Sequence, residues 1–280
     1  MRAVVITGTS TGIGAASAVE LAARGFTVFA GVRREADGEA LVRRAGGDVR
    51  PLLLDVTDQS AIDAAAKAVG AATGATGLAG LVNNAGVALA APLEYLPPDT
   101  FRRQLEVNVV GQLAVTQALL PLVRQARGRI VNVGSIGDRI VGPMTGAYHA
   151  SKFALAAMTH GLRLELSQDG IEVILVEPGT IATAIWQTST TAADRLFAGL
   201  PPEAGRRYGT RIEATREWAR AAARNGIPPE AVARVIAQAL VTSRPRTRYL
   251  VGRDAKIMSL LANLPDRLRD RLILRQGLST

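Results

Sequence analysis

The chain has 280 residues, of which 48% are hydrophobic, 20% charged and 4% aromatic, with a formal net charge of +9. A chain of this length and composition can bury a large core, and no run approaches the roughly 18 consecutive apolar residues that a transmembrane helix needs. The lack of cysteine excludes disulfides, thiolate catalysis and cysteine-ligated zinc, and with only two histidines we expect no metal site. Because the basic residues are scattered and aromatic residues are few, we also expect no nucleic acid partner.

Short apolar or β-branched runs alternate with helix-like stretches along the chain. The runs are "AVVITG", "TVFAGV", "VRPLLLD", "GLVNNAG", "GRIVNVGS" and "IEVILVEPG", and helix patterns cover 12–24, 36–45 and 58–70. Strands that are apolar throughout and alternate with helices indicate a parallel sheet covered on both faces. The sequence therefore predicts an α/β fold, a doubly wound parallel sheet in three layers, as one domain over 1–280. Because the strand pattern begins directly at "RAVVITG", we expect no leader segment and a cytoplasmic location.

The first strand is followed by a glycine-rich turn and a helix in "VVITGTSTGIGAASAVELAARG", with Gly8, Gly12 and Gly14 in the turn. Backbone N–H groups at a helix N-terminus bind a diphosphate, and glycines let the backbone approach it closely. This context predicts a dinucleotide-binding turn. The alternative is a tight turn between strand and helix without a ligand.

The second strand, "TVFAGVRRE", runs into Arg33 and Arg34. An acidic side chain at this point would bind the ribose hydroxyls of NAD, whereas a guanidinium can hold the 2′-phosphate of NADP through two hydrogen bonds. The sequence therefore favours NADP(H) over NAD(H), with Ser10 of the glycine turn as a second phosphate ligand. Glu35 and Asp37 follow closely and keep NAD(H) open.

Tyr148 and Lys152 lie four residues apart in "GAYHASKFAL", so in a helix they share one face. A free tyrosine has a pKa of about 10, and an adjacent ammonium favours the phenolate. The spacing predicts a cation beside a phenol. His149 lies one position on, well off that face, and we expect no role for it in the chemistry.

Three motifs together resemble the short-chain dehydrogenase/reductase superfamily. They are "TGTSTGIG" at 7–14, "NNAG" at 83–86 and "YHASK" at 148–152, and the resemblance covers residues 3–185. Within that superfamily, the segments "VFAGVRR", "AYHASKFAL" and "PGTIAT" look most like the branch that contains 17β-hydroxysteroid and retinol dehydrogenases. The resemblance implies a Rossmann fold and an NADP(H)-dependent oxidoreductase that transfers a hydride between nicotinamide and a secondary alcohol or ketone. It also implies a catalytic set of Asn108, Ser135, Tyr148 and Lys152.

The resemblance assigns a role to each of these residues. Lys152 would make Tyr148 usable as the general acid/base. Ser135 would hold the substrate oxygen, Lys152 would also bind the nicotinamide ribose, and Asn108 would position a water in a proton relay. The implied cofactor contacts are Gly8, Ser10, Gly12, Ile13, Gly14, Arg33, Arg34, Asp55, Val56, Asn83, Ala85, Gly86, Tyr148, Lys152, Pro178, Gly179, Ile181 and Thr183. Asp55 has a competing role as the N-cap of the next helix. A second hypothesis for the whole chain is a sensor that binds NADP(H) as a regulatory ligand and catalyses nothing.

The strand and helix rhythm breaks after Pro178. We predict a substrate-binding flap over 181–226, then a helix over 228–242, a short strand at "TRYLV" and an amphipathic tail over 254–280. An apolar flap suits a hydrophobic carbonyl or alcohol substrate, although its residues could equally form the core of two extra helices. The flap residues in question are Ile185, Trp186, Leu196, Phe197, Leu200, Tyr208 and Trp218.

The tail and one internal helix bear on assembly. We expect the tail to dock on the body of the protein, with dimer contact or a peripheral membrane contact as alternatives. The helix after Tyr148 and the helix around 100–122 resemble the pair through which the family forms oligomers, so we expect a homodimer or homotetramer. The apolar residues concerned are Phe153, Leu155, Met158, Leu162 and Leu166.

Overall fold

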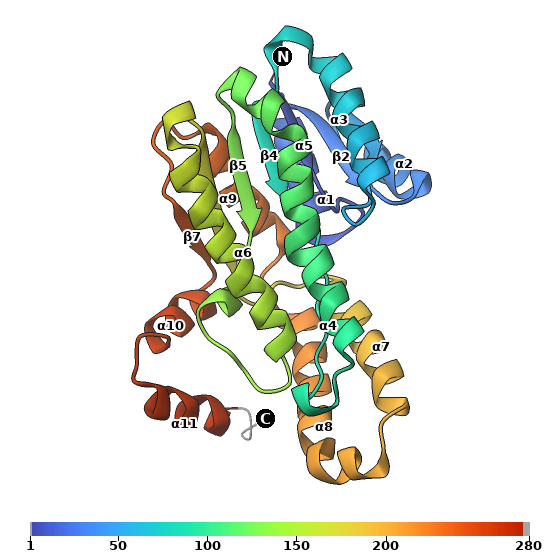
Figure 1. Ribbon diagram of the computed structural model, residues 1–280, viewed down its shortest axis with the longest axis vertical. Helices are drawn as coiled ribbons and strands as arrows, with labels where there is room; N and C mark the ends of the chain where they lie inside the picture. Colours follow the sequence, from blue (N-terminus) through green and yellow to red (C-terminus); the bar gives the residue numbers. More distant parts are fainter. Residues whose placement is uncertain (1, 277–280) are drawn as a thin grey trace.

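The computed structural model describes residues 2–276, and seven parallel strands form one sheet at its centre (Figure 1). The strands are β1 (Ala3–Ile6), β2 (Thr27–Val32), β3 (Val49–Leu53), β4 (Gly80–Asn83), β5 (Arg129–Val133), β6 (Glu172–Pro178) and β7 (Arg248–Val251). Their order is β3-β2-β1-β4-β5-β6-β7, so the direction of winding reverses between β1 and β4. The doubly wound prediction is confirmed, and this reversal marks the edge where such sheets bind ligands.

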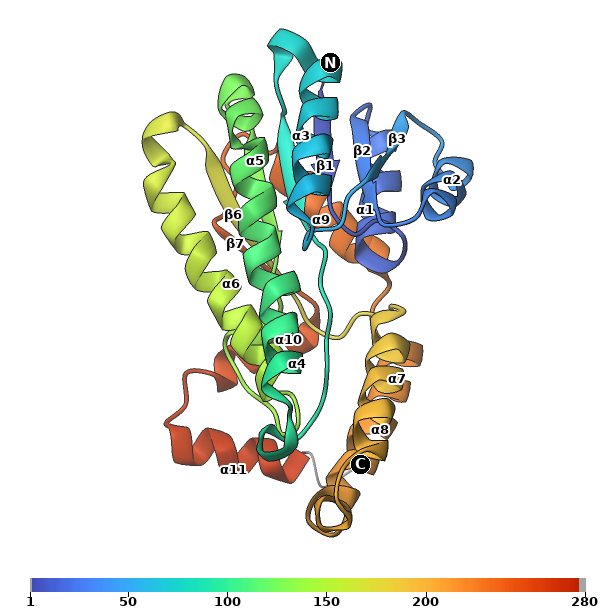
Figure 2. The same ribbon diagram turned by 45° about the vertical axis from the view of Figure 1, so that its right-hand side comes forward.

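Helices cover both faces of the sheet (Figure 2). The helices of the body are α1 (Gly12–Ala23), α2 (Glu35–Arg44), α3 (Gln59–Thr73), α4 (Pro98–Leu105), α5 (Gly111–Ala126), α6 (Gly146–Glu165) and α9 (Pro229–Val241). One buried cluster joins α1 and α9 to the sheet, and a second joins α3, α5 and α6 to the other face. The five central strands are almost entirely buried, which explains their apolar sequences, whereas the edge strands β3 and β7 are partly exposed.

Local chemistry sets several helix boundaries. Pro98, Pro202 and Pro229 each stand in the first turn of their helix, where a missing N–H costs nothing. Asp58 caps α3, since its carboxylate accepts hydrogen bonds from the N–H groups of Ser60 and Ala61. The N-cap role considered for Asp55 is therefore wrong. The helix begins one turn later than that role requires.

Helices α4 and α5 form one rod, joined by a π-helical turn over Glu106–Val110. The combined stretch Pro98–Ala126 is the one helix among the described residues that is long and apolar enough to cross a membrane by length and composition. Buried core helices pass the same test, and Val115, Leu119 and Val123 of α5 lie in the core against the sheet. Length and composition alone therefore assign no membrane segment.

Two further helical units lie beyond the sheet at the end that carries the C-termini of the strands (Figures 1 and 2). The first is a pair, α7 (Ile185–Ala198) and α8 (Pro202–Asn225), and the second is α10 (Arg253–Leu261) followed by α11 (Asp266–Gln276). They coincide with the predicted flap and tail, of which 277–280 lie outside the described residues. Ala255 anchors α10 by its burial.

The apolar side chains of α6 divide between two faces. Leu155 and Leu166 are buried in the core of their own chain and cannot meet a second copy, so their inclusion among the oligomer contacts is wrong. Phe153 and Leu164 are instead exposed, at 42% and 72%. An apolar stripe read from sequence alone cannot separate these two faces, because both recur at helical spacing.

Candidate active site

The glycine turn joins β1 to α1 at the winding reversal. Gly8 and Gly12 have φ of +69° and +59°, which only glycine adopts without strain. A Cβ at Gly14 would lie 2.2 Å from the carbonyl oxygen of Gly8, so the chain packs against itself there. Thr11, the N-cap of α1, makes no side-chain hydrogen bond to the first turn of the helix. The turn thus leaves a close backbone surface with helical N–H groups, which fits a diphosphate.

Thr7 and Asn84 pin this turn to the end of β4. The Thr7 hydroxyl oxygen accepts hydrogen bonds from the N–H groups of Asn84 and Ala85, both at 2.9 Å. In return the Asn84 amide donates to the carbonyl oxygens of Thr7 and Gly8 at 2.9 and 3.0 Å. The predicted set omitted Asn84, although its place as the second asparagine of "NNAG" carried the signal.

Asn83, which the predicted set included, points the other way. Its side chain is fully buried and donates to Thr116 and Asn132 at 2.8 and 2.9 Å. Alternate side chains of a strand face opposite sides of the sheet, so neighbouring asparagines diverge. Any contact of Asn83 with a cofactor would therefore have to come from its backbone. Ala85, two residues on, lies directly against Gly8 of the glycine turn.

The two arginines after β2 have different surroundings. Arg34 makes a two-pronged ion pair with Asp37, at 2.9 and 2.7 Å, and this pair raises the pKa of Arg34 and lowers the pKa of Asp37. Arg33 is exposed, and its side chain makes no hydrogen bond within the described part of the chain. The same is true of Ser10 in the glycine turn. Of the two guanidiniums, Arg33 is the one left open to a ligand.

Asp55 and Val56 follow β3 at the same edge. The Asp55 carboxylate accepts hydrogen bonds from the N–H and hydroxyl of Thr57, at 2.9 and 2.8 Å, which shapes the turn before α3. Val56 is buried, and its carbonyl oxygen lies against Gly111 at the start of α5. These contacts fix the backbone at a place where an adenine ring could lie in such a sheet.

Ser135, Tyr148 and Lys152 come together between β5 and α6. The Ser135 hydroxyl bonds to the Tyr148 phenol, and it also accepts a hydrogen bond from the N–H of Gly137 at 3.0 Å. The Lys152 ammonium is 5.8 Å from the centre of the Tyr148 ring and donates to the carbonyl oxygen of Val133 at 2.9 Å. The helical spacing predicted from the sequence therefore does bring the phenol and the ammonium onto one face.

Burial governs the ionisation of this pair. Lys152 is only 5% exposed, and its burial lowers its pKa to about 8. The pKa of Tyr148 is raised, chiefly by burial, although the Ser135 hydrogen bond acts in the opposite direction. The chain by itself therefore holds Tyr148 as the neutral phenol. The phenolate expected from the sequence depends on the charges of both Lys152 and a bound oxidised nicotinamide. A neutral phenol is a proton donor.

Asn108 lies in the π-helical turn and is fully buried. Its amide oxygen accepts a hydrogen bond from the N–H of Val87 at 2.8 Å, and its amide nitrogen donates to the Val87 carbonyl and the Ser151 hydroxyl, each at 2.9 Å. The Ser151 hydroxyl in turn donates to the Tyr148 carbonyl at 2.6 Å. The Asn108 side chain therefore links the loop after Gly86 to α6, and its amide group is already engaged in these hydrogen bonds. A water in the expected proton relay would have to bind the backbone of Asn108.

His149 supports the turn that carries Ser135. One ring nitrogen, Nδ1, lies 2.8 Å from the carbonyl oxygen of Gly137, and a Cβ at Gly137 would come within 2.5 Å of that nitrogen. Burial lowers the pKa of His149, so its ring stays neutral at neutral pH. Its role is to position Ser135.

The segment after β6 closes the site from the other side. Thr183 lies against Gly12, 3.2 Å from the position of a Cβ there, while Ile181 is buried and pairs with Ile227. The carboxylate of Asp254, in the first turn of α10, accepts a hydrogen bond from the N–H of Thr180 at 2.6 Å. A Cβ at Gly179 would come within 2.3 Å of that carboxylate, so the glycine makes room for it. The tail is thus fastened to the segment predicted to meet the nicotinamide, a link the sequence did not reveal.

The aromatic side chains of the flap pack within it. Trp186 and Trp218 meet edge to face at 4.8 Å, and the Trp186 indole donates to the Ile181 carbonyl at 2.6 Å. At the far end, Tyr208 donates to Glu94 at 2.7 Å, and Arg207 pairs with the same carboxylate at 3.0 Å. Trp218 is nevertheless 44% exposed, and Tyr208 contacts Glu94 outside the flap, so these contacts do not decide between a substrate wall and a core of two extra helices.

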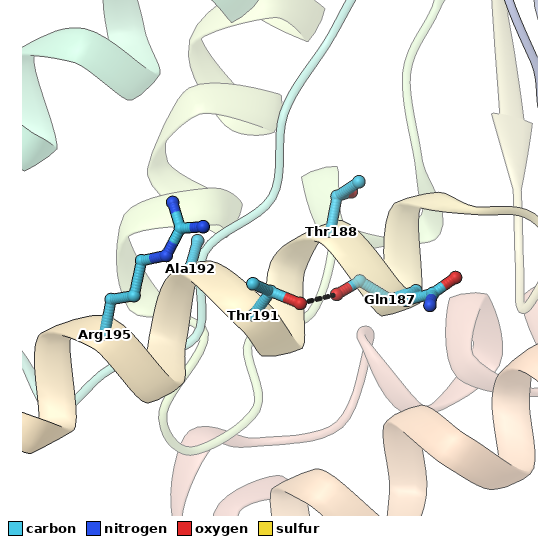
Figure 3. A pocket seen from close by; sticks show the side chains of 5 residues that line it. All are labelled: Gln187, Thr188, Thr191, Ala192 and Arg195. Carbon is cyan, nitrogen blue, oxygen red and sulfur yellow. Dashed lines mark hydrogen bonds between the residues drawn. The ribbon is translucent and has the colours of Figure 1, made fainter.

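A surface hollow of about 420 Å³ lies along α7. Figure 3 shows its lining on one side of the helix: Gln187, Thr188, Thr191, Ala192 and Arg195. A second hollow of about 380 Å³ lies on α8 and includes Trp218. Neither contains a residue of the predicted catalytic set. Four of the five residues along α7 carry polar groups, but the surface that they present to the hollow is mostly apolar.

Comparison with known proteins links this architecture to characterised relatives. The family model for short chain dehydrogenases matches residues 2–194. Retinol dehydrogenase 5 of Mus musculus is 38% identical over 96% of this chain and 87% of its own length. An NADPH-dependent 3-dehydrocapnine reductase of Ornithobacterium rhinotracheale is 34% identical over 97% and 96%. A short chain dehydrogenase/reductase of Burkholderia phymatum, solved in complex with NAD, is 25% identical over 93% of this chain and 92% of its own, with a TM-score of 0.79.

Proposed function

This chain belongs to the short-chain dehydrogenase family, and from that premise we propose that it is an NADP(H)-dependent enzyme that interconverts a hydrophobic ketone and a secondary alcohol. Its relatives are dehydrogenases and reductases, and it is an oxidoreductase acting on CH–OH or C=O groups. The observation that carries the finer proposal is the Tyr148 phenol, whose interaction with Ser135 lowers its pKa and whose ring centre is 5.8 Å from the Lys152 ammonium on the same face of α6.

The glycine turn fits a nicotinamide dinucleotide, because Gly8 and Gly12 adopt positive φ and Gly14 lets the start of α1 pack closely against the turn, with backbone N–H groups at the N-terminus of the helix. When bound, this cofactor supplies or takes the hydride. Residues proposed to hold it are Gly8, Gly12, Ile13 and Gly14 at the diphosphate, with Gly86, Pro178, Gly179, Ile181 and Thr183 along the remainder. Lys152, already fixed by Val133, is in place to donate to a ribose hydroxyl.

The proton step uses side chains already in contact. In reduction, the Tyr148 phenol donates its proton to the substrate oxygen while the Ser135 hydroxyl donates a hydrogen bond to that oxygen as negative charge develops. Because the pKa of Tyr148 is raised, the phenol is protonated at neutral pH, which suits reduction. In the oxidation direction the same group must act as phenolate, so oxidation should accelerate as the pH rises.

The preference for NADP(H) rests on Arg33. We expect Arg33→Ala to bind NADPH and NADH with similar affinity, because the substitution removes the one guanidinium at the end of β2 that no acidic residue holds through hydrogen bonds. Calorimetric titration of both cofactors measures this. Arg34→Ala is the matched control and should keep the preference, since Arg34 is paired with Asp37. Equal affinities in the unmodified protein would contradict the proposal.

The substrate is proposed to be largely hydrophobic, with the α7–α8 flap closing over it. Support comes from the relatives named as retinol dehydrogenases and from the position of the flap beyond the strand ends. The mostly apolar surface of the hollow along α7 suits such a substrate, and Arg195 would face any hydrophilic end of the molecule.

A homodimer or homotetramer is proposed through the rod of α4 and α5 and the helix α6. Phe153 and Leu164 on α6 and Val110 in the rod are large apolar side chains left exposed by the single chain. We expect size-exclusion chromatography with light scattering to give two or four times the chain mass. Leu164→Asp should lower that mass, and a monomer in the unmodified protein would refute the assembly.

The non-catalytic sensor remains the competing function, and one experiment separates the two. NADPH consumption is followed by absorbance against a panel of small, aromatic, steroid and retinoid carbonyls, and NADP⁺ reduction against the matching alcohols. Turnover establishes the enzyme and begins to bound its substrate. Binding of NADPH without turnover across the panel in both directions would favour the sensor, which has no need of the proton-transfer pair.

A further inference from the structure

Four charged side chains meet behind the Ser135 turn. Asp138 ends the short 3-10 helix at 136–138, Arg139 follows it, Glu177 lies in β6 and Arg248 begins β7. Both carboxylate side chains are 0% exposed, and the two arginine side chains are only 28% and 26% exposed. A buried carboxylate is costly unless it is paired with a cation and its oxygens accept hydrogen bonds, whereas the partly exposed guanidiniums keep some contact with solvent.

Glu177 accepts most of the hydrogen bonds that the two guanidiniums donate within the cluster. Its Oε1 accepts from Arg139 at 2.5 Å and from Arg248 at 2.7 Å, and its Oε2 accepts from the same two guanidiniums at 3.1 and 2.9 Å. These hydrogen bonds lower the pKa of Glu177 despite its burial. Glu177 is therefore the ionised member of the cluster.

Asp138 is left with one weaker donor. Its Oδ1 accepts from Arg248 at 3.1 Å, while its Oδ2 is buried without a donor. A buried carboxylate oxygen with no donor is expensive, but a protonated one can itself donate, and the neighbouring Glu177 carboxylate is an acceptor. Burial and the charge of Glu177 raise the pKa of Asp138 to about 8.

We propose that Asp138 and Glu177 share one proton, and that Asp138 is thereby a positioning residue that fixes the Ser135 turn and keeps a second negative charge away from Tyr148. The turn from Gly134 to Arg139 carries Ser135 at one end and Asp138 at the other, and His149 holds its middle at Gly137. Arg139 also donates to Ser259 of α10 at 3.3 Å. The acid pair therefore joins the proposed catalytic serine to β6, β7 and the tail. This inference rests on the role proposed for Tyr148.

The electrostatic link runs from Asp138 to α6. An ionised Asp138 raises the pKa of both Tyr148 and Lys152, so it would oppose formation of the phenolate. With the proton shared, the cluster presents the charges of one carboxylate and two guanidiniums. The charged or titratable groups around Asp138 are Glu177 of β6, Arg248 of β7, Arg139 of its own turn, and Tyr148, His149, Lys152 and His160 of α6.

Asp138→Asn tests the shared proton, because the amide can donate to Glu177 at every pH. A group whose pKa is higher in the folded than in the unfolded state stabilises the fold below the unfolded value and loses that contribution as the pH rises through the folded value. The melting temperature of the variant relative to the unmodified protein should therefore climb between pH 4 and about 8, by roughly 2 to 4 °C or more, and then level off. Asp99→Asn removes an acid that is 92% exposed and should give a flat difference. A flat difference for Asp138→Asn as well would overturn the proposal.

The same variant tests the link to Tyr148. In alcohol oxidation, the rise of kcat/KM with pH should shift to lower pH in Asp138→Asn, on the order of half a unit or more, because above a pH of about 8 the unmodified protein carries an ionised Asp138 that opposes the phenolate and the amide does not. An unshifted profile beside a positive stability result would overturn that link. If no substrate turns over, the proposed function fails instead, and the phenolate is then titrated by its ultraviolet absorbance against Tyr148→Phe. The same downward shift is expected there, and its absence counts equally against the link.

Discussion

Tyr148→Phe is expected to lose turnover by roughly 10² to 10⁴-fold while binding cofactor as the unmodified protein does. The substitution removes the phenol oxygen that bonds to Ser135 and leaves the ring, whose packing and distance to Lys152 stay the same. The loss should fall on kcat, since proton transfer belongs to the chemical step. Initial rates of NADPH oxidation with a substrate found on the panel measure it, beside calorimetry of NADPH binding.

Tyr249→Phe is the matched control. Its phenol oxygen accepts a hydrogen bond from the N–H of Arg246 at 3.0 Å, in a turn before β7, so the same atom is lost from a structural position. That variant should keep its kcat. Turnover in Tyr148→Phe comparable to the control would remove Tyr148 from the proton step and leave Ser135 or a water as donor.

Gly14→Ala is expected to destabilise the fold and to weaken NADPH binding together. The added methyl would lie 2.2 Å from the Gly8 carbonyl oxygen and 2.5 Å from the Asn84 amide nitrogen, and the first of these is backbone. Because backbone must shift to relieve that contact, we expect a loss of about 1 to 3 kcal/mol in the free energy of unfolding. The glycine turn would open with it, and affinity for NADPH should fall. Chemical denaturation and calorimetry measure the two effects.

A glycine in open surroundings supplies the comparison. Gly205 lies within α8, and a Cβ there would meet nothing within 4 Å. Gly205→Ala should therefore stabilise the helix by up to about 1 kcal/mol and leave cofactor affinity alone. If Gly14→Ala were as stable as the unmodified protein and bound NADPH as tightly, the close packing of the turn would not matter for binding.

The fold was predictable because its signals are local. Each buried strand is a short apolar run, and each is separated from the next by a helix whose pattern has its own period. The same holds for the glycine turn, where Gly8, Gly12 and Gly14 lie within a few positions of one another. Tyr148 and Lys152 also lie on one helical turn, so their shared face followed from spacing alone.

The errors arose where a side chain's direction depends on distant packing. Asn83 and Asn84 are adjacent, yet one turns into the core beside Thr116 and the other reaches back to Gly8. The ionisation of Tyr148 also depends on burial by segments far along the chain. The cluster of Asp138, Glu177 and Arg248 forms where β6 and β7 lie side by side, a contact that no local sequence pattern predicts. Asp138 and Arg248 are 110 positions apart in the sequence.

The pairing of Trp186 with Trp218 has an optical consequence. These are the only two tryptophans in the chain, and both belong to the flap. Intrinsic tryptophan emission therefore originates in α7 and α8 alone, with no background from the nucleotide-binding body. A chromophore that enters the site beneath the flap would quench it by energy transfer. The protein thus carries its own fluorescent reporter, in the segment proposed to close over the substrate.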